Sequence, residues 1–96
     1  MVSKKQTYRI ELTPAASRDL KAIAKQDRRL LVQISKAIDD LKFHPYPPQS
    51  QKLQAEEDNI YRLRVKDFRI IYQVQSQLIM ITIVRVGHRR QIYRHL

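Results

Sequence analysis

Residues 61–72, YRLRVKDFRIIY, alternate apolar and basic side chains at the two-residue period of a β-strand. The alternation is interrupted only at Lys66-Asp67, which is typical of a turn between two strands. The segment therefore predicts an antiparallel hairpin that displays Arg62, Arg64 and Arg69. Like charges placed together in this way are unfavourable unless an anion relieves them, so the hairpin favours phosphate binding. The simpler interpretation is a solvated sheet face without a ligand.

Helical periodicity precedes the hairpin. Apolar residues recur on one face of residues 15–25 and again on one face of a segment from about Asp27 to Leu41. Thr13 followed by Pro14 is a typical helix start, because threonine caps the first turn and proline fits its first position. The prolines within residues 43–48 end the second helix.

Strands are predicted at residues 8–12, 60–65, 68–75 and 78–86. The last of these is apolar at nearly every position, which predicts a central strand covered on both faces. The order is β-α-α-β-β-β, an α+β fold in which a helical hairpin packs on a small, mainly antiparallel sheet. Three connections are also predicted: a polar loop at 49–58, a turn near Ser76-Gln77 and a sharp turn at Gly87.

Length and charge limit the possible functions. A chain of 96 residues is expected to form a single domain, residues 1–96, around one hydrophobic core. The chain has 19 Lys and Arg against 9 Asp and Glu, and residues 60–96 contain 8 of the basic groups with 1 acidic group. A net charge of +10 favours nucleic acid, an anionic membrane or an acidic protein as partner.

Other features exclude functional classes. The absence of cysteine excludes disulfides and thiolate metal sites. His44 and His95 have no acidic residue at ligand spacing, so we expect no metal and no other cofactor. No stretch approaches the ~18 apolar residues of a membrane span, and the first residues lack the apolar region of a signal peptide. We therefore expect a cytoplasmic protein with no membrane partner.

Two segments, YRLRVKDFRIIY at 61–72 and VRVGHRRQIYR at 84–94, resemble the signature of the RelE/ParE toxin superfamily. The resemblance extends from the strand at Tyr8 to Arg94 and implies the RelE-like microbial RNase fold. It also implies a toxin of a type II toxin–antitoxin pair, with a cognate antitoxin protein as partner. Members similar to RelE cut mRNA in the ribosomal A site, whereas ParE-like members poison DNA gyrase and lack the nuclease residues.

We interpret the chain as closer to RelE: a ribosome-dependent endoribonuclease that inhibits translation and contacts mRNA and ribosomal RNA. Two alternatives remain, a ParE-like gyrase inhibitor and a non-catalytic basic RNA-binding module. By resemblance, Arg62 and Arg64 match the paired basic positions of the second strand, where RelE has lysines, and Arg69 matches the arginine of the third strand. Tyr93 matches the late tyrosine. The basic residue after the glycine is matched by either Arg89 or Arg90.

RNA cleavage without a metal uses the 2′-hydroxyl as nucleophile, so it requires a base, an acid and cations that stabilise the phosphorane. Arginine supplies the cations, each worth roughly 3–4 kcal/mol in the transition state, but it does not exchange protons. Proton transfer is assigned first to Tyr93, whose pKa neighbouring guanidinium groups would lower, and second to His88, with Lys52 and Lys66 as further candidates. Tyr93 as a packing residue is the alternative. The predicted catalytic residues are Arg62, Arg64, Arg69, Arg89, Tyr93 and His88, and the predicted RNA-binding residues are Arg90, Lys52, Lys66 and Arg94.

Overall fold

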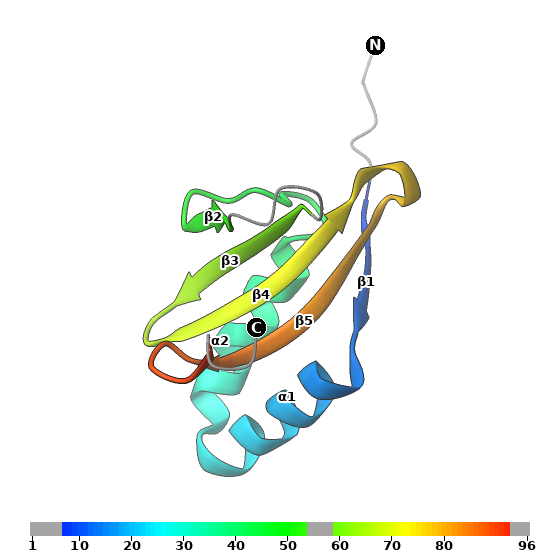
Figure 1. Cartoon of the computed structure of the whole chain (residues 1–96). Coiled ribbons are helices and arrows are strands. Elements are labelled where there is room, and N and C mark those ends of the chain that lie inside the picture. Colours follow the sequence, from blue (N-terminus) through cyan, green and yellow to red (C-terminus); the bar gives the residue numbers. More distant parts are fainter. Residues whose placement is uncertain (1–6, 54–58, 93–96) are drawn as a thin grey trace.

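The structure, a computed structural model, describes residues 7–53 and 59–92 (Figure 1). Two helices pack on one five-stranded sheet, and a short 3-10 helix precedes the last strand. In chain order the elements are β1 (Arg9–Leu12), α1 (Pro14–Gln26), α2 (Arg28–Asp40), β2 (Ser50–Lys52), β3 (Ile60–Val65), β4 (Phe68–Gln75), η1 (Ser76–Leu78) and β5 (Met80–His88).

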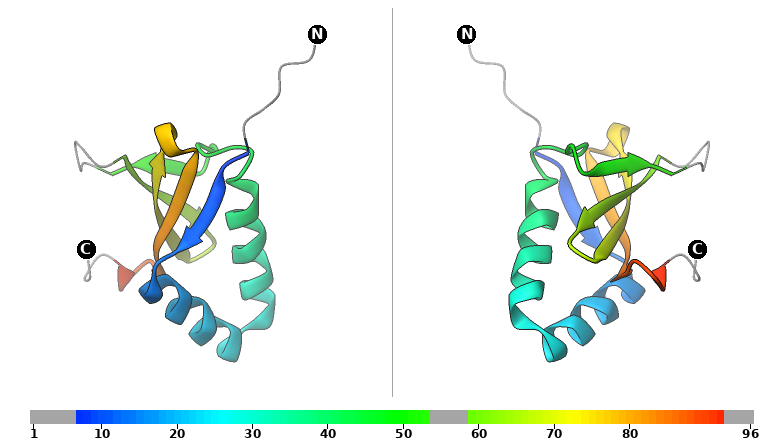
Figure 2. Two further views of the ribbon diagram at one scale, coloured as in Figure 1. Left: turned by 90° about the vertical axis from the view of Figure 1, so that its right-hand side faces the viewer. Right: turned by 90° about the vertical axis from the view of Figure 1, so that its left-hand side faces the viewer.

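The strands lie in the order β1-β5-β4-β3-β2. β1 runs parallel to β5, and all other neighbouring pairs are antiparallel. Both α-helices cover the same face of the sheet, and no helix formed by the described residues lies over the opposite face (Figure 2). The predicted α+β class with a mainly antiparallel sheet is confirmed. Neither described helix combines the length and the apolar character needed to cross a bilayer.

The helix starts follow from local capping. The hydroxyl oxygen of Thr13 accepts a hydrogen bond from the backbone N–H of Ala16 at 3.0 Å, and Pro14 occupies the first turn. Asp27 ends α1 by donating its N–H to the carbonyl of Ile23, and its carboxylate starts α2 by accepting from Leu30 at 3.1 Å. Asp27 therefore caps both helices, and it lies where the sequence predicts the second helix to start.

The main core lies between the helices and the sheet. Its members come from both helices and from β3, β4 and β5, and Tyr8 and Ile10 of the β1 region pack against it. The residues with no exposed surface in this cluster are Ala16, Ile34, Leu41, Ile70, Tyr72, Ile81 and Ile83. Most of the buried hydrophobic residues in the described part of the chain thus form one continuous core.

Three sequence expectations about the sheet are wrong. β5 starts at Met80 and is covered by helices on one face only, so its residues alternate between buried and half-buried. Leu78 lies in η1 and is 65% exposed. Ser50–Lys52 is not loop but the short strand β2, which pairs with β3. The polar side chains of β2 carry no hydrophobic alternation from which a strand can be predicted.

Gly87 is the third correction. It lies within β5, paired with Arg69, and its φ is not in the left-handed region. No sharp turn occurs there. A Cβ atom on Gly87 would lie 3.0 Å from Cδ1 of Ile92, so the missing side chain makes room for a close approach.

Candidate nucleic-acid interface

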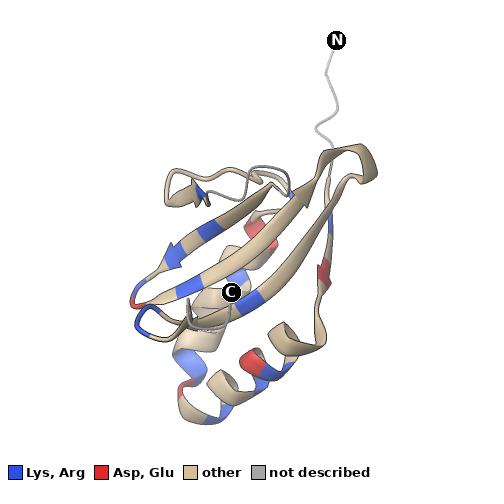
Figure 3. Cartoon of the chain, viewed as in Figure 1, with Lys and Arg blue, Asp and Glu red and all other residues tan. Residues whose placement is uncertain are grey.

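Three predicted site residues gather on the face of the sheet that lacks helices. Arg64 on β3 pairs directly with Arg69 on β4, and Arg62 lies two residues before Arg64 on the same face. Figure 3 shows these strands carrying basic positions with few acidic ones nearby. The three arginines line a hollow of about 260 Å³, which we call the arginine pocket; its remaining wall is Pro48, Gln49, Ser50 and Gln51.

Arg62 is oriented by β2. Its Nε donates to Oε1 of Gln51 at 3.1 Å, and its Nη2 contacts the same amide oxygen. Gln51 is the cross-strand partner of Arg62, so the pairing of β2 with β3 brings the amide to the guanidinium. The short polar strand β2, which was predicted as a loop, therefore supplies one wall of the arginine pocket.

Arg69 is oriented by neutral carbonyl groups. Its Nη1 donates to the carbonyl oxygens of Lys66 at 3.1 Å and Phe68 at 2.9 Å. Among the described residues, no carboxylate forms an ion pair with Arg64 or Arg69. Two guanidinium groups placed directly across strands repel each other, and a phosphate between them removes that repulsion.

The turn between β3 and β4 also holds Arg89. The backbone N–H of Arg89 donates to the carbonyl of Asp67 at 2.7 Å, and its Nε lies 3.8 Å from Oδ1 of Asp67. Arg90 is exposed and contacts His88 instead, through its backbone N–H at 3.2 Å from Nδ1. Of these two arginines, Arg89 is the one joined to the β3–β4 turn, next to Lys66. Lys66 is exposed and has a positive φ of 54°.

His88 lies on the other side of the sheet from the arginine pocket. Its ring packs edge-on against Phe68 with ring centroids 5.6 Å apart, and it lines hollows shared with α1 and α2. This placement results from a register shift between β4 and β5. Tyr72 pairs with Ile83, whereas Ile71 pairs with Arg85, so β5 contains one extra residue between these two pairs. Regular alternation from Ile83 would have put His88 on the arginine face.

The remaining predicted residues are not part of the arginine pocket as described. Lys52 on β2 pairs with Tyr61 and is exposed. Tyr93 and Arg94 lie outside the described residues. Within residues 7–53 and 59–92, no three His, Asp or Glu side chains gather in a way that would hold a metal ion.

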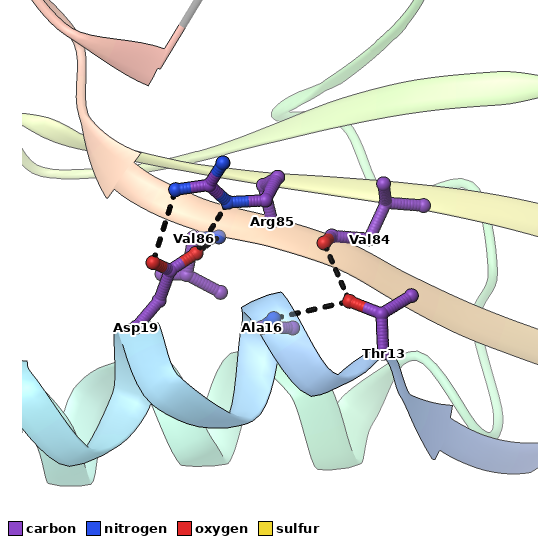
Figure 4. Close-up of polar contacts among 6 residues, drawn as sticks. All are labelled: Thr13, Ala16, Asp19, Val84, Arg85 and Val86. Atoms are coloured by element: carbon purple, nitrogen blue, oxygen red, sulfur yellow. Dashed lines mark hydrogen bonds and ion pairs between the residues drawn. The ribbon is translucent and has the colours of Figure 1, made fainter. Parts of the chain in front are cut away.

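Arg85, which the sequence does not single out, is bound tightly within the fold (Figure 4). Its Nε and Nη2 donate to the two carboxylate oxygens of Asp19 on α1 at 2.8 and 3.2 Å, and the backbone N–H of Val86 donates to the same carboxylate at 2.9 Å. Hydrogen bonding to Asp19 raises the pKa of Arg85. Beside it, the hydroxyl of Thr13 donates to the carbonyl of Val84 at 2.7 Å. These contacts fasten α1 to β5.

Aromatic side chains support the loop that forms the wall of the arginine pocket. Tyr61 lies between Tyr46 and Tyr72, with ring centroids 5.0 and 5.7 Å away. The hydroxyl of Tyr72 donates to the carbonyl of Pro45 at 2.7 Å, and burial raises the pKa of Tyr72 to about 12. Tyr61, Phe68 and Tyr72 are packing residues, since Tyr72 is fully buried and the other two pack against the core.

Comparison with known proteins identifies the family. A family model described as ParE toxin of type II toxin–antitoxin system, parDE, matches residues 10–93. The chain belongs to this family, within the RelE/ParE superfamily. The resemblance inferred from residues 61–72 and 84–94 is thereby confirmed, and the protein is a toxin of the type II toxin–antitoxin class. No curated protein sequence matches the chain significantly.

Solved structures of other toxins share the fold. The toxin–antitoxin complex RelBE2 from Mycobacterium tuberculosis matches with a TM-score of 0.71 and 26% identity, covering 91% of this chain and 97% of that chain. The archaeal RelE–RelB complex from Pyrococcus horikoshii matches with a TM-score of 0.75 and 25% identity, covering 86% and 96%. YafQ from E. coli matches with a TM-score of 0.65 and 19% identity, covering 90% and 98%, which supports the fold alone.

Proposed function

We propose that this RelE/ParE-family toxin is a metal-independent endoribonuclease that cuts mRNA in the ribosomal A site and so stops translation. The observation that carries the proposal is the arginine pocket, in which Arg62, Arg64 and Arg69 converge on the helix-free face. No described carboxylate pairs with Arg64 or Arg69, so their charge remains available for a phosphate.

The chemistry follows from what arginine does. The RNA 2′-oxygen attacks the adjacent phosphorus, the bond to the 5′-oxygen breaks, and a 2′,3′-cyclic phosphate remains on the upstream fragment. Arg64 and Arg69 present forked donors to the non-bridging oxygens, which gain negative charge in the phosphorane. Removing one such donor typically slows a reaction by 10²–10³.

In this proposal Tyr93 is the base that removes the proton of the 2′-hydroxyl, and the departing 5′-oxygen takes up a proton from solvent. His88 ranks below it because its ring packs on Phe68, on the helix side of the sheet. Arg89, held at the β3–β4 turn by its contacts with Asp67, adds positive charge near that turn. Lys52, Lys66, Arg90 and Arg94 would contact RNA more weakly, through its phosphates.

A cognate antitoxin is the proposed protein partner. Two of the similar structures are complexes that contain one, RelBE2 and the archaeal RelE–RelB pair. A net charge of +10 suits a partner with an acidic segment that covers or displaces part of the basic face.

Inhibition of DNA gyrase is the second candidate function. The match of residues 10–93 to a model of ParE toxins favours it, because the resemblance associates the ParE branch with gyrase and not with RNA cleavage. In that case the arginine pocket would be a contact surface and Tyr93 would have no chemical role.

Primer extension on cellular messages after induced expression tests the proposal. We expect new cuts with 2′,3′-cyclic phosphate ends in the wild type, about 10²–10³-fold fewer with Arg69→Ala, and none with Tyr93→Phe. Arg18→Ala, which removes an exposed arginine from α1, is the matched control and should cut like the wild type.

Other outcomes separate the alternatives. Intact messages together with growth arrest and gyrase-dependent DNA breaks would replace the nuclease with the second candidate function. Intact messages without growth arrest would indicate a basic RNA-binding module.

A further inference from the structure

Two buried hydrophobic residues in the described part of the chain, Ile71 and Ile92, do not belong to the main core. Ile71 lies between Ile70 and Tyr72, both of which point into that core, so Ile71 points to the helix-free face. The short segment that follows β5 lies on the side of the sheet away from α2 (Figure 2). Ile92, 1% exposed, ends the described part of that segment. Both residues are therefore buried outside the core that lies between the helices and the sheet.

Gly87 provides the seat for Ile92. A Cβ atom at Gly87 would lie 3.0 Å from Cδ1 of Ile92 and 3.7 Å from its Cβ. The first distance is too short for an ordinary carbon–carbon contact, whereas the second is ordinary. The side chain of Ile92 therefore lies directly on the bare backbone of Gly87, and its terminal methyl group is the atom that a Cβ at residue 87 would displace.

This seat lies next to Arg69 in the sheet. Gly87 pairs with Arg69, and Arg69 pairs with Arg64, so the three residues form a line across β5, β4 and β3. The segment leading to Ile92 is held at two other points. The N–H of Arg89 donates to the carbonyl of Asp67 at 2.7 Å, and the N–H of Gln91 donates to that of His88 at 2.9 Å.

We infer that Ile92, seated on Gly87, is a positioning residue for Tyr93, the residue that follows it in the chain. Tyr93 is the next residue, and consecutive Cα atoms are only about 3.8 Å apart. A displacement of Ile92 is therefore passed directly to the residue proposed as the base. This inference rests on the proposed nuclease function for its catalytic consequence, but the seat itself is a property of the fold.

The variant pair Gly87→Ala and Gly87→Ala/Ile92→Val tests the inference. Alanine puts a Cβ against Cδ1 of Ile92, and valine removes that methyl group while keeping the Cβ. On ribosomes stalled with a defined codon in the A site, we expect Gly87→Ala to cut at least ten times more slowly at saturating toxin. The toxin concentration that gives half the maximal rate should change less than twofold. The double variant should recover most of the rate.

A second readout does not depend on cleavage. Amide hydrogen exchange of Gln91, whose N–H bonds to His88, should be faster in Gly87→Ala and return toward the wild-type rate in the double variant. If Gly87→Ala does not fold, Ile92→Ala is used in its place. This variant removes the side chain that packs on Gly87, keeps the glycine, and has the same expected results.

The outcomes separate the two claims. Unchanged exchange of Gln91 in Gly87→Ala, or a double variant no better than the single one, overturns the inference. Equal losses in rate and in apparent affinity also overturn it, because they indicate a damaged binding face instead of a displaced group. If the amide exchange of Gln91 changes as expected but the wild type cuts no RNA, the proposed nuclease function is wrong. The packing of Ile92 on Gly87 is then still supported.

Discussion

At the joint between α1 and β5, the guanidinium of Arg85 lies against both carboxylate oxygens of Asp19, whereas no described carboxylate pairs with Arg64 or Arg69 on β3 and β4. The carboxylate of Asp19 neutralises Arg85 at the joint, whereas Arg69 in the arginine pocket donates to the carbonyl oxygens of Lys66 and Phe68. An arginine with an acid of its own holds the fold together, and one oriented by neutral groups is ready for a phosphate.

The largest effect is expected from breaking the joint. Asp19→Asn keeps the shape of the side chain but leaves Arg85 without a counter-charge while its side chain is 26% exposed. We expect a loss of about 2–3 kcal/mol in the free energy of unfolding, measured with urea, because a mostly buried charge loses its partner. Asp39→Asn is the control, since the side chain of Asp39 is 69% exposed, and should cost less than about 0.5 kcal/mol. Equal costs in both variants would show that the joint adds nothing beyond a surface ion pair.

A smaller effect is expected where the wall of the arginine pocket is fastened by a neutral bond. Tyr72→Phe removes the hydrogen bond to Pro45 and should cost about 1 kcal/mol near neutral pH. In the wild type, burial raises the pKa of Tyr72 to about 12 from its ordinary value of about 10, so the folded state retains the proton longer than the unfolded state.

The stability that comes from Tyr72 is therefore fully present below pH ~10 and is lost as the pH rises towards 12, by up to about 1.4 kcal/mol per pH unit. Urea unfolding between pH 9 and about 11.5 should show a steeper decline in the wild type than in Tyr72→Phe. Tyr8→Phe is the control and should follow the wild type. Parallel curves for all three proteins would rule out the contribution of Tyr72.

The smallest effect on stability is expected within the arginine pocket. Arg64→Ala removes a like charge opposite Arg69, so stability should stay the same or increase by about 0.2–1 kcal/mol. RNA affinity should fall, and the slope of its logarithm against the logarithm of salt concentration should decrease by about 1. Arg18→Ala, on α1, should leave that slope unchanged. A marked loss of stability in Arg64→Ala would mean that this arginine is structural, like Arg85.

The parts of the fold that could be predicted from sequence are those decided by neighbours along the chain. The Thr13-Pro14 start, the Asp27 corner and the β3–β4 hairpin each depend on a few adjacent residues. The parallel pairing of β1 with β5 joins distant segments, and β2 is three polar residues long. Neither leaves a periodic signal.

The candidate site also has some features that could be predicted from the sequence and others that could not. Strand alternation was sufficient to bring Arg62, Arg64 and Arg69 together, because the hairpin is regular. His88 lies on the other face, because the extra residue in β5 reverses the direction of the side chains that follow. The pairing of Asp19 with Arg85 was not predictable either, since the two residues are 66 positions apart.

The parallel pairing of β1 with β5 has a consequence for synthesis on the ribosome. β1 is made first among the described strands and its partner last, so α1 and α2 emerge well before the strand that completes their core. The central strand β5 also joins β4 to β1, and without it the sheet is in two pieces. A nascent chain therefore remains an incomplete fold until nearly all of the described sequence has been translated, because such long-range contacts form only after the intervening chain exists. The sheet that carries Arg62, Arg64 and Arg69 is therefore complete only after the ribosome has translated β5.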